Sequence, residues 1–511
     1  MTGGALADAF EVIEHVRASV SHDGSAAELL EACDRRLREP LRIGIAGMVK
    51  AGKSTLLNAL IGEEIAPTDA GECTRTVTWY RHGTTPSITV HRRDGGTERM
   101  PVRRRDGRLF LDLGALRAPD VDWIDVEWPS ENLRSTVLID TPGIASLSTD
   151  VSARTASFLT PSRAPSAADA IIYLLRHVHA SDLTFLEEFR DTAAGESQTV
   201  NALAVLSRAD EIGSGRIDAL ISASKIAGRY RHDGELRALA LDVIPVAGLL
   251  AEGARTLRER EYAAFRVLAD LHRDLRSRAL VSADRFLGEN SGIPLDLETR
   301  RALLARFGVF GIRLGTAIVR AGADSSTELA ERMVRQSGLV DVQHFVEEQF
   351  RSRAGALKVR GVAQELELLV RRSSRPERAR LLAEVERLWA ATHDLRELAL
   401  LARLRTGVTG LSAGDAAEAE RIVGGAGTSV HARLGLTDAA DRRDLRERVA
   451  RRLDHWRGVA ESPLSDQTTV QISRTVIRSI EGMASQIPAA HRSHRGVADV
   501  MAARGPAQGG R

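Results

Sequence analysis

The chain has little cysteine, little lysine and no excess of either charge. Its two cysteines, Cys33 and Cys73, lie far apart among 511 residues and show no metal-ligand spacing. Reduced thiols in a cytoplasmic protein are therefore expected. Lysine and arginine together number 71 and aspartate and glutamate 69, which leaves a net charge of +2. That balance gives no reason to expect a nucleic-acid partner.

Long apolar runs are also missing. No stretch approaches the roughly 18 residues that a membrane-spanning helix needs. The first residues, MTGGALADAFEVIEHVR, lack the basic region followed by an apolar one that a secretory signal carries. Any contact with a membrane is therefore expected to be peripheral.

Lysine accounts for only four of the 71 basic residues, and two of them, Lys50 and Lys53, stand in one short loop. Codon usage in a GC-rich genome would explain the general preference for arginine. Because almost every other cation is arginine, two lysines in one loop indicate positions where arginine would not fit.

Apolar periodicity divides the chain into four parts. Residues 1–40 contain two amphipathic helices, residues 41–255 alternate short apolar runs with helical segments, and residues 256–486 show helical periodicity alone. Residues 487–511 are poor in large apolar side chains and are expected to be a disordered tail. Strands are expected at 41–46, 87–91, 121–128, 135–139, 170–175, 202–206 and 242–246. In the helical part, Ser325 with Glu328 predicts a helix start and Gly338 a helix stop.

The stretch GIAGMVKAGKSTLLNAL, residues 44–60, matches the pattern G-x-x-x-x-G-K-[ST]. The glycines allow backbone N–H groups to point at phosphate oxygens, the lysine reaches the terminal phosphates and the serine hydroxyl can bind Mg²⁺. An ordinary glycine-rich turn is the alternative. The candidate phosphate-binding residues are Gly47, Val49, Lys50, Ala51, Gly52, Lys53, Ser54 and Thr55.

Two downstream motifs fit the phosphate side of a nucleotide site. LIDTPG places Asp140 at a strand end, where it can hold Mg²⁺ through water, and Gly143 where its N–H can meet a γ-phosphate. ECTRTVT supplies Thr74 and Thr76, either of which could close on Mg²⁺ as a first switch.

Two further motifs fit the guanine side. AVLSRAD offers Asp210 as acceptor for the two N–H groups of guanine, with Ser207 and Arg208 where GTPases usually have asparagine or threonine and then lysine. Arg208 can lie over the base. VIPVAG places Val246 and Ala247 where a backbone N–H could reach guanine O6. The order of motifs favours GTP/GDP with Mg²⁺ over ATP.

With these motifs, and with helices on both sides of the nucleotide domain, the chain resembles the bacterial dynamin-like GTPases. More narrowly it is similar to the isoniazid-inducible dynamin-like proteins of mycobacteria, in particular the shorter member encoded beside a lipid-binding one. The expected fold is an α/β P-loop GTPase head, with a mixed, mostly parallel sheet and helices on both faces, plus an all-α neck and an elongated helical-bundle stalk. The resemblance implies a neck built from residues 5–38, a helix after 255 and a helix near 465–485.

The resemblance also implies self-association through GTPase heads, membrane bending or fusion, and a related dynamin-like partner. Glutamines that position the attacking water elsewhere are replaced here by Val49 and Ile144. Lys50 occupies a position associated with a charge-compensating cation, which gives the hypothesis that its ammonium group supplies that charge. Contact of Lys50 with solvent or with a partner head is the alternative. Candidate catalytic residues are Lys53, Thr74 and Lys50.

An arginine-rich helix break is the candidate membrane tip. Arg371, Arg372 and Arg375 in VRRSSRPER could meet anionic headgroups, and a solvated turn is the alternative. FGVFGIRLG, residues 307–315, is the other apolar segment, and its glycines favour close helix packing. The leading function is a mechanochemical GTPase that acts on the cytoplasmic face of a membrane, as a peripheral protein at the inner face of the plasma membrane. A regulatory or assembly GTPase with a helical partner-binding module and a low-activity subunit of a heteromeric pair are the alternatives.

Overall fold

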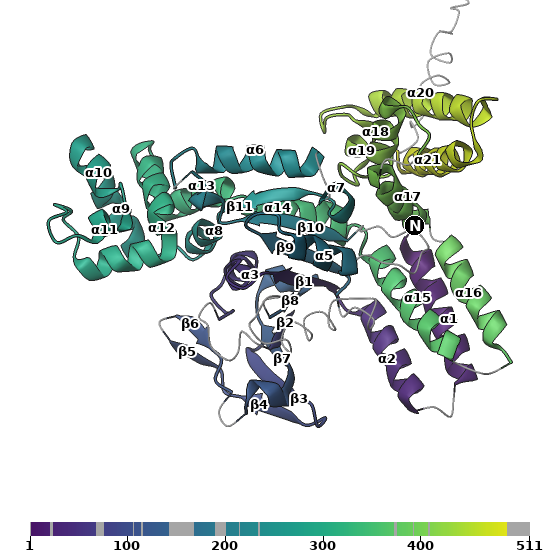
Figure 1. Ribbon diagram of the computed structural model, residues 1–511, viewed down its shortest axis with the longest axis horizontal. Coiled ribbons are helices and arrows are strands. Elements are labelled where there is room, and N and C mark those ends of the chain that lie inside the picture. Colours follow the sequence, from purple (N-terminus) through teal and green to yellow (C-terminus); the bar gives the residue numbers. More distant parts are fainter. Residues whose placement is uncertain are drawn as a thin grey trace, which may run out of the picture.

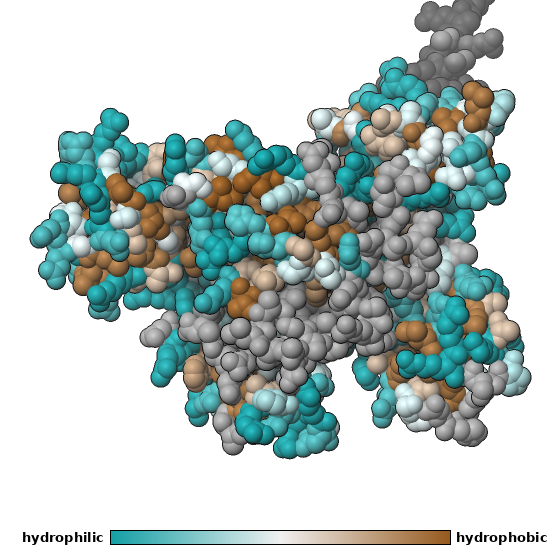
Figure 2. Space-filling view, viewed as in Figure 1, coloured by the Kyte–Doolittle hydropathy of each residue, from teal (hydrophilic) through white to brown (hydrophobic). Residues whose placement is uncertain are grey.

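The computed structural model shows a central sheet with helices around it, an α/β head joined to an all-α region (Figure 1). It describes residues 2–20, 24–67, 76–105, 107–113, 116–142, 168–189, 201–213, 215–232, 236–372, 376–391, 393–406 and 409–487. Hydrophilic and apolar residues are interspersed over the face that Figure 2 shows.

The sheet has nine strands in the order β11-β10-β9-β1-β8-β2-β7-β3-β4. The five strands from β11 to β8 are parallel, β2 runs antiparallel to β8, and β3 runs antiparallel to both β7 and β4. The strands are β1 (Leu41–Gly47), β2 (Val77–His82), β3 (Ser87–Arg92), β4 (Thr97–Met100), β7 (Val121–Trp128), β8 (Thr136–Asp140), β9 (Ala170–Leu175), β10 (Ala202–Ser207) and β11 (Val243–Val246), with β5 (Arg103–Arg105) and β6 (Arg108–Phe110) as a separate ribbon.

All seven expected strand segments form strands, and β2, β4, β5 and β6 were not predicted. β4 and β5 carry mostly charged side chains that are exposed, so they show neither an apolar run nor apolar alternation. The mixed, mostly parallel sheet is confirmed.

Helices cover both faces of the sheet, as alternate residues of a buried strand require. In β9, Ile172 and Leu174 face the side that carries α3, whereas Ile171, Tyr173 and Leu175 face α5, α6 and α7. The helices of the head are α3 (Lys53–Ile61), α5 (Ala180–Phe189), α6 (Ala219–His232), α7 (Leu236–Leu239) and α8 (Gly248–Arg255).

Beyond the head, the described chain is helical and divides into three groups (Figure 1). One group packs on α8 and consists of α9 (Glu259–Asp270), α10 (Arg273–Ala279), α11 (Ala283–Leu287), α12 (Leu297–Arg320) and α13 (Ser326–Gln336). A second contains α1 (Thr2–Ser19), α2 (Gly24–Arg38), α15 (Ala354–Arg372) and α16 (Arg378–Ala391). The third consists of α17 (His393–Thr406), α18 (Ala413–Ile422), α19 (Val430–Leu434), α20 (Arg442–Glu461) and α21 (Gln467–Gln486). The first group is connected to the second by α14 (Leu339–Phe345) and a π-helical turn (Val346–Arg351).

The composition of the neck differs from the expectation. The N-terminal helices pack against α15 and α16, whereas α9 packs in the first helical group and α21 against α20 and α17. The expected three-part neck was therefore wrong. The apolar face of α15, which carries Val362 and Leu366, shares one core with buried Ile13 and Val16 of α1 and Leu30 of α2. The surface on which α1 and α2 pack is therefore α15.

α12 is long and apolar enough to cross a membrane by length and composition, contrary to the prediction that no stretch is. Half of its most apolar window is buried. A Cβ on Gly315 would lie 2.6 Å from the Phe265 ring, so this glycine serves close packing of α12 on α9, as predicted for residues 307–315. Gly308 (φ 61°, ψ 176°) divides α12 into two helical segments.

The turn between α13 and α14 fixes the first helical group to the sheet. Ser325 caps α13 by accepting from the Glu328 amide, and the helix ends at Gln336, as predicted. Gly338 has φ 82°, and a Cβ there would lie 2.1 Å from the carbonyl oxygen of Pro245 in β11. Any other residue at 338 would therefore clash with the strand.

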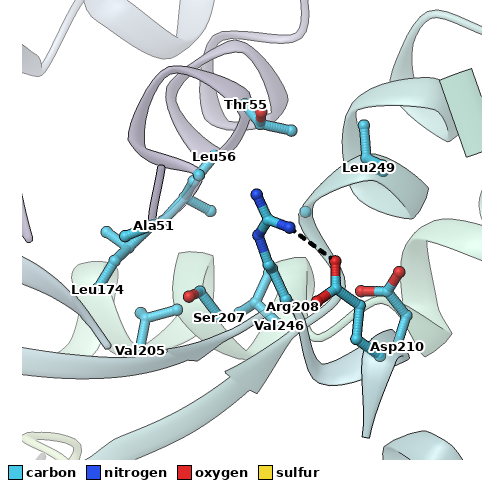
Figure 3. Close-up of a pocket in the computed structure, with 13 residues that line it drawn as sticks. Ala51, Thr55, Leu56, Leu174, Val205, Ser207, Arg208, Asp210, Val246 and Leu249 are labelled. Atoms are coloured by element: carbon cyan, nitrogen blue, oxygen red, sulfur yellow. Dashed lines mark hydrogen bonds and ion pairs between the residues drawn. The ribbon is translucent and has the colours of Figure 1, made fainter. Parts of the chain in front are cut away.

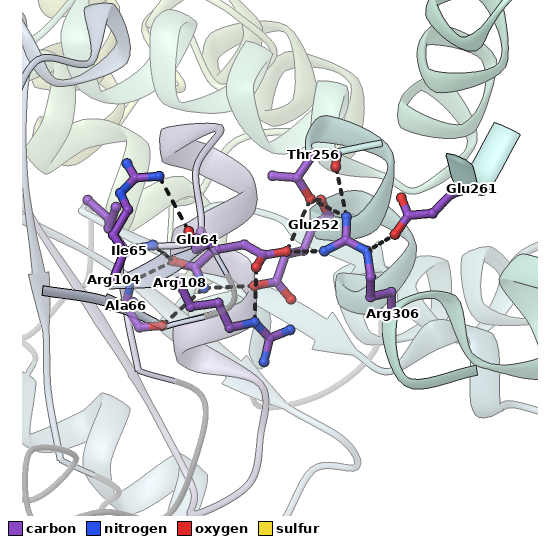
Figure 4. A network of polar contacts seen from close by, with 11 residues as sticks. Glu64, Ile65, Ala66, Arg104, Arg108, Glu252, Thr256, Glu261 and Arg306 are labelled. Carbon is purple, nitrogen blue, oxygen red and sulfur yellow. Dashed lines mark hydrogen bonds and ion pairs between the residues drawn. The ribbon is translucent and has the colours of Figure 1, made fainter. Parts of the chain in front are cut away.

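A buried polar network joins the first helical group to the end of α3 (Figure 4). Arg306 of α12 pairs with Glu64 and Glu261 and donates to the carbonyl oxygen of Thr256 at 2.8 Å. Glu64 also pairs with Arg108 of β6 at 2.9 Å. The carboxylates of Glu64 and Glu261 and the guanidinium of Arg306 are all buried. Their pairing offsets the free-energy cost of removing these charges from water.

The same region holds a buried carboxyl on α8. Asn58 of α3 donates to Glu252 Oε1 at 2.7 Å. Burial raises the pKa of Glu252 to about 7, with nearby Glu64 adding to the rise. Glu252 therefore carries a proton in the folded protein at mildly acidic pH, where an unfolded chain would have released it.

We expect Glu252→Gln to remove a pH dependence of stability. The folded-state pKa, about 7, lies above the usual 4.5, so the parent loses stability as pH rises from about 4.5 to 7. Glutamine keeps the acceptor for Asn58 without a charge, and at about 1.4 kcal/mol per pKa unit the variant gains up to about 3 kcal/mol at pH 8 and much less at pH 5. Thermal unfolding across this range, with exposed Glu331→Gln as control, measures it. An equal effect at both ends of the range would contradict it.

Candidate nucleotide-binding site

The loop between β1 and α3 has the backbone of a phosphate-binding loop. Gly47 has φ 145°, and a Cβ there would lie 2.4 Å from the carbonyl oxygen of Leu174 on β9. Gly52 has φ 95° and precedes the first residue of α3. Both predicted glycines are therefore required, and they aim the N-terminus of α3 at the edge where the parallel strands end.

Lys53 bends back over this loop. Its Nζ donates to the carbonyl oxygens of Gly47 and Met48 at 3.2 and 3.3 Å. Burial lowers the pKa of Lys53, and the charge of Asp140 opposes that effect. The ammonium group thus stands on the phosphate side of the loop, where anionic oxygens would compensate its charge.

Ser54 and Asp140 form the metal side of the site. Ser54 Oγ donates to Asp140 Oδ2 at 3.1 Å. Asp140 Oδ1 is buried and has no hydrogen-bond partner among the described residues, and burial raises the pKa of this carboxyl. A hydroxyl beside a buried carboxylate with an unused oxygen suits Mg²⁺, which prefers oxygen ligands.

Thr76 adds a second unused oxygen. Its Oγ1 is buried without a partner in the described part of the chain, and it stands two residues before Thr78, which pairs with Asp140 across β2 and β8. Thr74 and Gly143 lie outside the described residues. Among the described residues, no group of three or more His, Cys, Asp or Glu could hold a metal ion, so a cation here would also need phosphate oxygens.

The base side of the site is a pocket of about 150 Å³. This is smaller than the space a whole ligand usually occupies, so it fits only part of a nucleotide. Ser207 is buried and donates to the carbonyl oxygen of Leu175 at 3.1 Å. The lining comprises Ala51, Gly52, Thr55, Leu56, Leu174, Val205, Ser207, Arg208, Asp210, Glu211, Val246, Gly248 and Leu249.

Asp210 lies in a short 3₁₀ helix (Ala209–Glu211) directly after β10. Burial raises the pKa of its carboxyl, and Glu211 adds to the rise. Two converging N–H donors, as guanine presents, would satisfy this carboxylate.

Arg208 connects the base motif with the phosphate loop. Its guanidinium donates to Glu211 Oε1 at 2.8 Å and to the carbonyl oxygen of Lys50 at 3.1 Å. Figure 3 shows it rising into the pocket below Thr55 of α3, with Leu249 of α8 to one side. Arg208 (φ 53°) and Lys50 (φ 64°) are the non-glycine residues of the described chain with positive φ. The contact holds both strained residues in place.

Only part of the predicted base loop VIPVAG faces the pocket. Val246 lines it, whereas the Ala247 amide donates to the carbonyl oxygen of Ser337 at 2.9 Å. The start of α8 supplies Gly248, the last residue of VIPVAG, and Leu249, which the motif did not indicate because its place depends on how α8 packs on α3.

Two loop residues and the arginine turn are exposed. The Val49 residue is 46% exposed, and Lys50 beside it is exposed too. Arg371 and Arg372 end α15, with Arg371 paired to Glu367 at 2.6 Å. Arg375 and Ile144 lie outside the described residues.

Several known proteins are similar to this chain in sequence. A model of the dynamin family matches residues 43–194. The isoniazid-induced protein IniC of Mycobacterium tuberculosis is 41% identical over 460 residues, which cover 90% of this chain and 93% of that protein. A bacterial dynamin-like protein of Nostoc punctiforme is 32% identical over 114 residues, covering 20% of this chain and 16% of that protein.

One solved structure, of an oligomerised bacterial dynamin pair, matches 94% of this chain and 79% of its own at 13% identity and a TM-score of 0.31. The near full-length similarity to IniC carries the assignment. The chain belongs to the dynamin-like GTPase family, in the group of the mycobacterial IniC protein.

Proposed function

We propose that this protein binds and hydrolyses GTP and couples nucleotide-dependent self-association to the remodelling or maintenance of the cytoplasmic membrane. The observation that carries the proposal is the pairing of Ser54 with buried Asp140 at the phosphate loop, with Asp210 on the base side. The protein would act as a peripheral protein at the inner face of that membrane.

Mg²⁺ would be held by Ser54 directly and by Asp140 through water, with Thr74 or Thr76 closing over it. When bound, the cation neutralises charge on the phosphates. Lys53 binds and orients the terminal phosphates, and the N–H groups at the start of α3 hold their oxygens.

Self-association through the heads is supported by exposed apolar side chains beside the site. Val49 in the phosphate loop is 46% exposed, and Leu249 at the pocket is 38% exposed. A second head placed over the nucleotide would cover both residues.

A low-activity subunit of a heteromeric pair is the second candidate. Val49 favours it, because an aliphatic side chain stands where the eukaryotic dynamins carry a glutamine that positions water. The partner would then be a related dynamin-like protein encoded nearby. Anionic lipid would meet this protein at Arg371 and Arg372, or meet the partner instead.

The first test measures GTP turnover per molecule against protein concentration, with and without anionic liposomes. Association of heads predicts turnover that rises cooperatively with concentration. We expect Val49→Arg to abolish that rise by placing a like charge on both sides of the contact without repelling phosphate, and the affinity for GDP measured alongside distinguishes lost association from lost nucleotide binding. Light scattering with a GTP transition-state mimic measures the association directly. Turnover per molecule that is constant with concentration would contradict self-association.

Base specificity depends on Asp210. We expect Asp210→Asn to weaken GTP binding at least about 10-fold, because an amide cannot accept both guanine N–H groups. Xanthosine triphosphate, which has a carbonyl in place of the amino group, should bind the variant better than the parent. Competition binding with GTP, ATP and xanthosine triphosphate measures this, with Glu211→Gln as the neighbouring control. Unchanged GTP affinity would show that Asp210 does not read the base.

The Lys50 hypothesis has its own test. If the ammonium group supplies positive charge near the β/γ bridge, Lys50→Ser and Lys50→Gly should lower turnover about 10-fold or more in sodium buffer and regain it in potassium buffer. Lys50→Gly suits the backbone at φ 64° and so separates loss of charge from strain. Turnover equal to that of the parent in both buffers would end the hypothesis.

A further inference from the structure

A groove of about 440 Å³ lies between the segment that leads into α6, the end of α10 and the second segment of α12. Four arginines line it, and no aspartate or glutamate does: Arg216, Arg276, Arg313 and Arg320. None of these residues lines the nucleotide pocket.

Arg313 builds the groove. Its guanidinium donates to the carbonyl oxygens of Leu280 at 2.7 Å and Val281 at 2.8 Å, and to that of Gly215. These acceptors belong to opposite walls, so one side chain ties the walls together. All three are neutral carbonyl groups, and no carboxylate of the described residues lies within ion-pair distance of Arg313.

The other arginines receive little compensation. Arg276 donates to the carbonyl oxygen of Leu271 at 2.7 Å, and its pKa is lowered by burial and by the like charge of Arg320. Among the described residues, the one carboxylate within ion-pair distance of the four is Asp218, 3.3 Å from Arg216. The groove thus concentrates positive charge in a chain whose overall charge is near zero.

Aliphatic side chains border the charge. Ile217 and Val281 line the groove at 59% and 57% exposure, and Ile221 on α6, one turn after Ile217, is 63% exposed. Exposed aliphatic side chains gathered at a basic groove differ from the scattered ones that any surface carries.

We propose that this groove binds the phosphate group of an anionic ligand, and that its aliphatic rim makes a phospholipid headgroup the source. Guanidinium groups match phosphate oxygens in geometry and charge. Aliphatic side chains at the rim would enter the boundary between headgroups and acyl chains. The proposal rests on the proposed membrane association and gives it a site apart from the α15–α16 turn.

The test replaces the two arginines that the walls do not depend on. Arg216→Gln with Arg320→Gln removes two charges and leaves Arg313 and its carbonyl contacts intact. We expect binding to phosphatidylcholine vesicles that contain phosphatidylglycerol to weaken about 30-fold, at about 1 kcal/mol per arginine. Arg442→Gln with Arg451→Gln, both exposed on α20, is the control for charge loss. Unchanged GDP affinity verifies folding.

A second assay separates a headgroup from free phosphate. Pyrophosphate is titrated calorimetrically into protein whose nucleotide site is saturated with GDP. Ile217→Ser with Ile221→Ser should weaken vesicle binding and leave pyrophosphate binding unchanged.

Each outcome decides the matter. Weaker vesicle binding in the groove variant, with the control unaffected, supports the site with lipid as its source. If the groove variant loses pyrophosphate binding and the parent binds no vesicles, the groove is a phosphate site. That result counts against the membrane part of the proposed function. Parent-like binding in both assays overturns the groove. If Arg371→Gln with Arg372→Gln alone releases vesicles, the groove proposal fails and the proposed function stands.

Discussion

The contact between the α13–α14 turn and β11 is the constraint on which the arrangement of head and helices depends. Gly338 lies so close to Pro245 that no side chain fits between them, and the Ala247 amide, at the start of the base loop, donates to Ser337. The base loop is therefore held partly by the helical region. A change in that loop when guanine binds would act on the α13–α14 turn without passing through a flexible linker.

The hydrophobic core extends this connection. One continuous cluster of buried residues runs from α1 and α2 through the α3 face of the sheet to α15 and α21, so the helices of the second and third groups share a core with the head. On the other side of α3, Asn58 and Glu64 meet α8, α9 and α12 through the network around Arg306. α3 begins at the phosphate loop, and its far end is thus fastened to the first helical group.

The sequence predicted what depends on local patterns. Gly47, Gly52 and Lys53 follow from a motif, Ser325 and Gly338 from helix-end chemistry, and the buried strands from short apolar runs. Contacts between distant residues could not be predicted this way. Arg208 and Lys50 are 158 positions apart, and the choice of α15 and α16 as partners of α1 is decided by complementary surfaces that many amphipathic helices could offer. The charged strands β4 and β5 and the arginine groove were not predicted, because their residues show no apolar periodicity in the sequence.

α12 joins these separate features. Arg306 on its first segment enters the network behind α3, and Arg313 on its second segment holds the loop that follows Asp210. Gly308, with φ 61°, lies between them and permits the two segments to differ in direction. The phosphate side and the base side of the pocket are thus each connected to one half of a single kinked helix. Both halves pack on α8 and α9. A movement of either side of the pocket on nucleotide binding would therefore change the bend at Gly308 or be transmitted along α12 to the arginine groove.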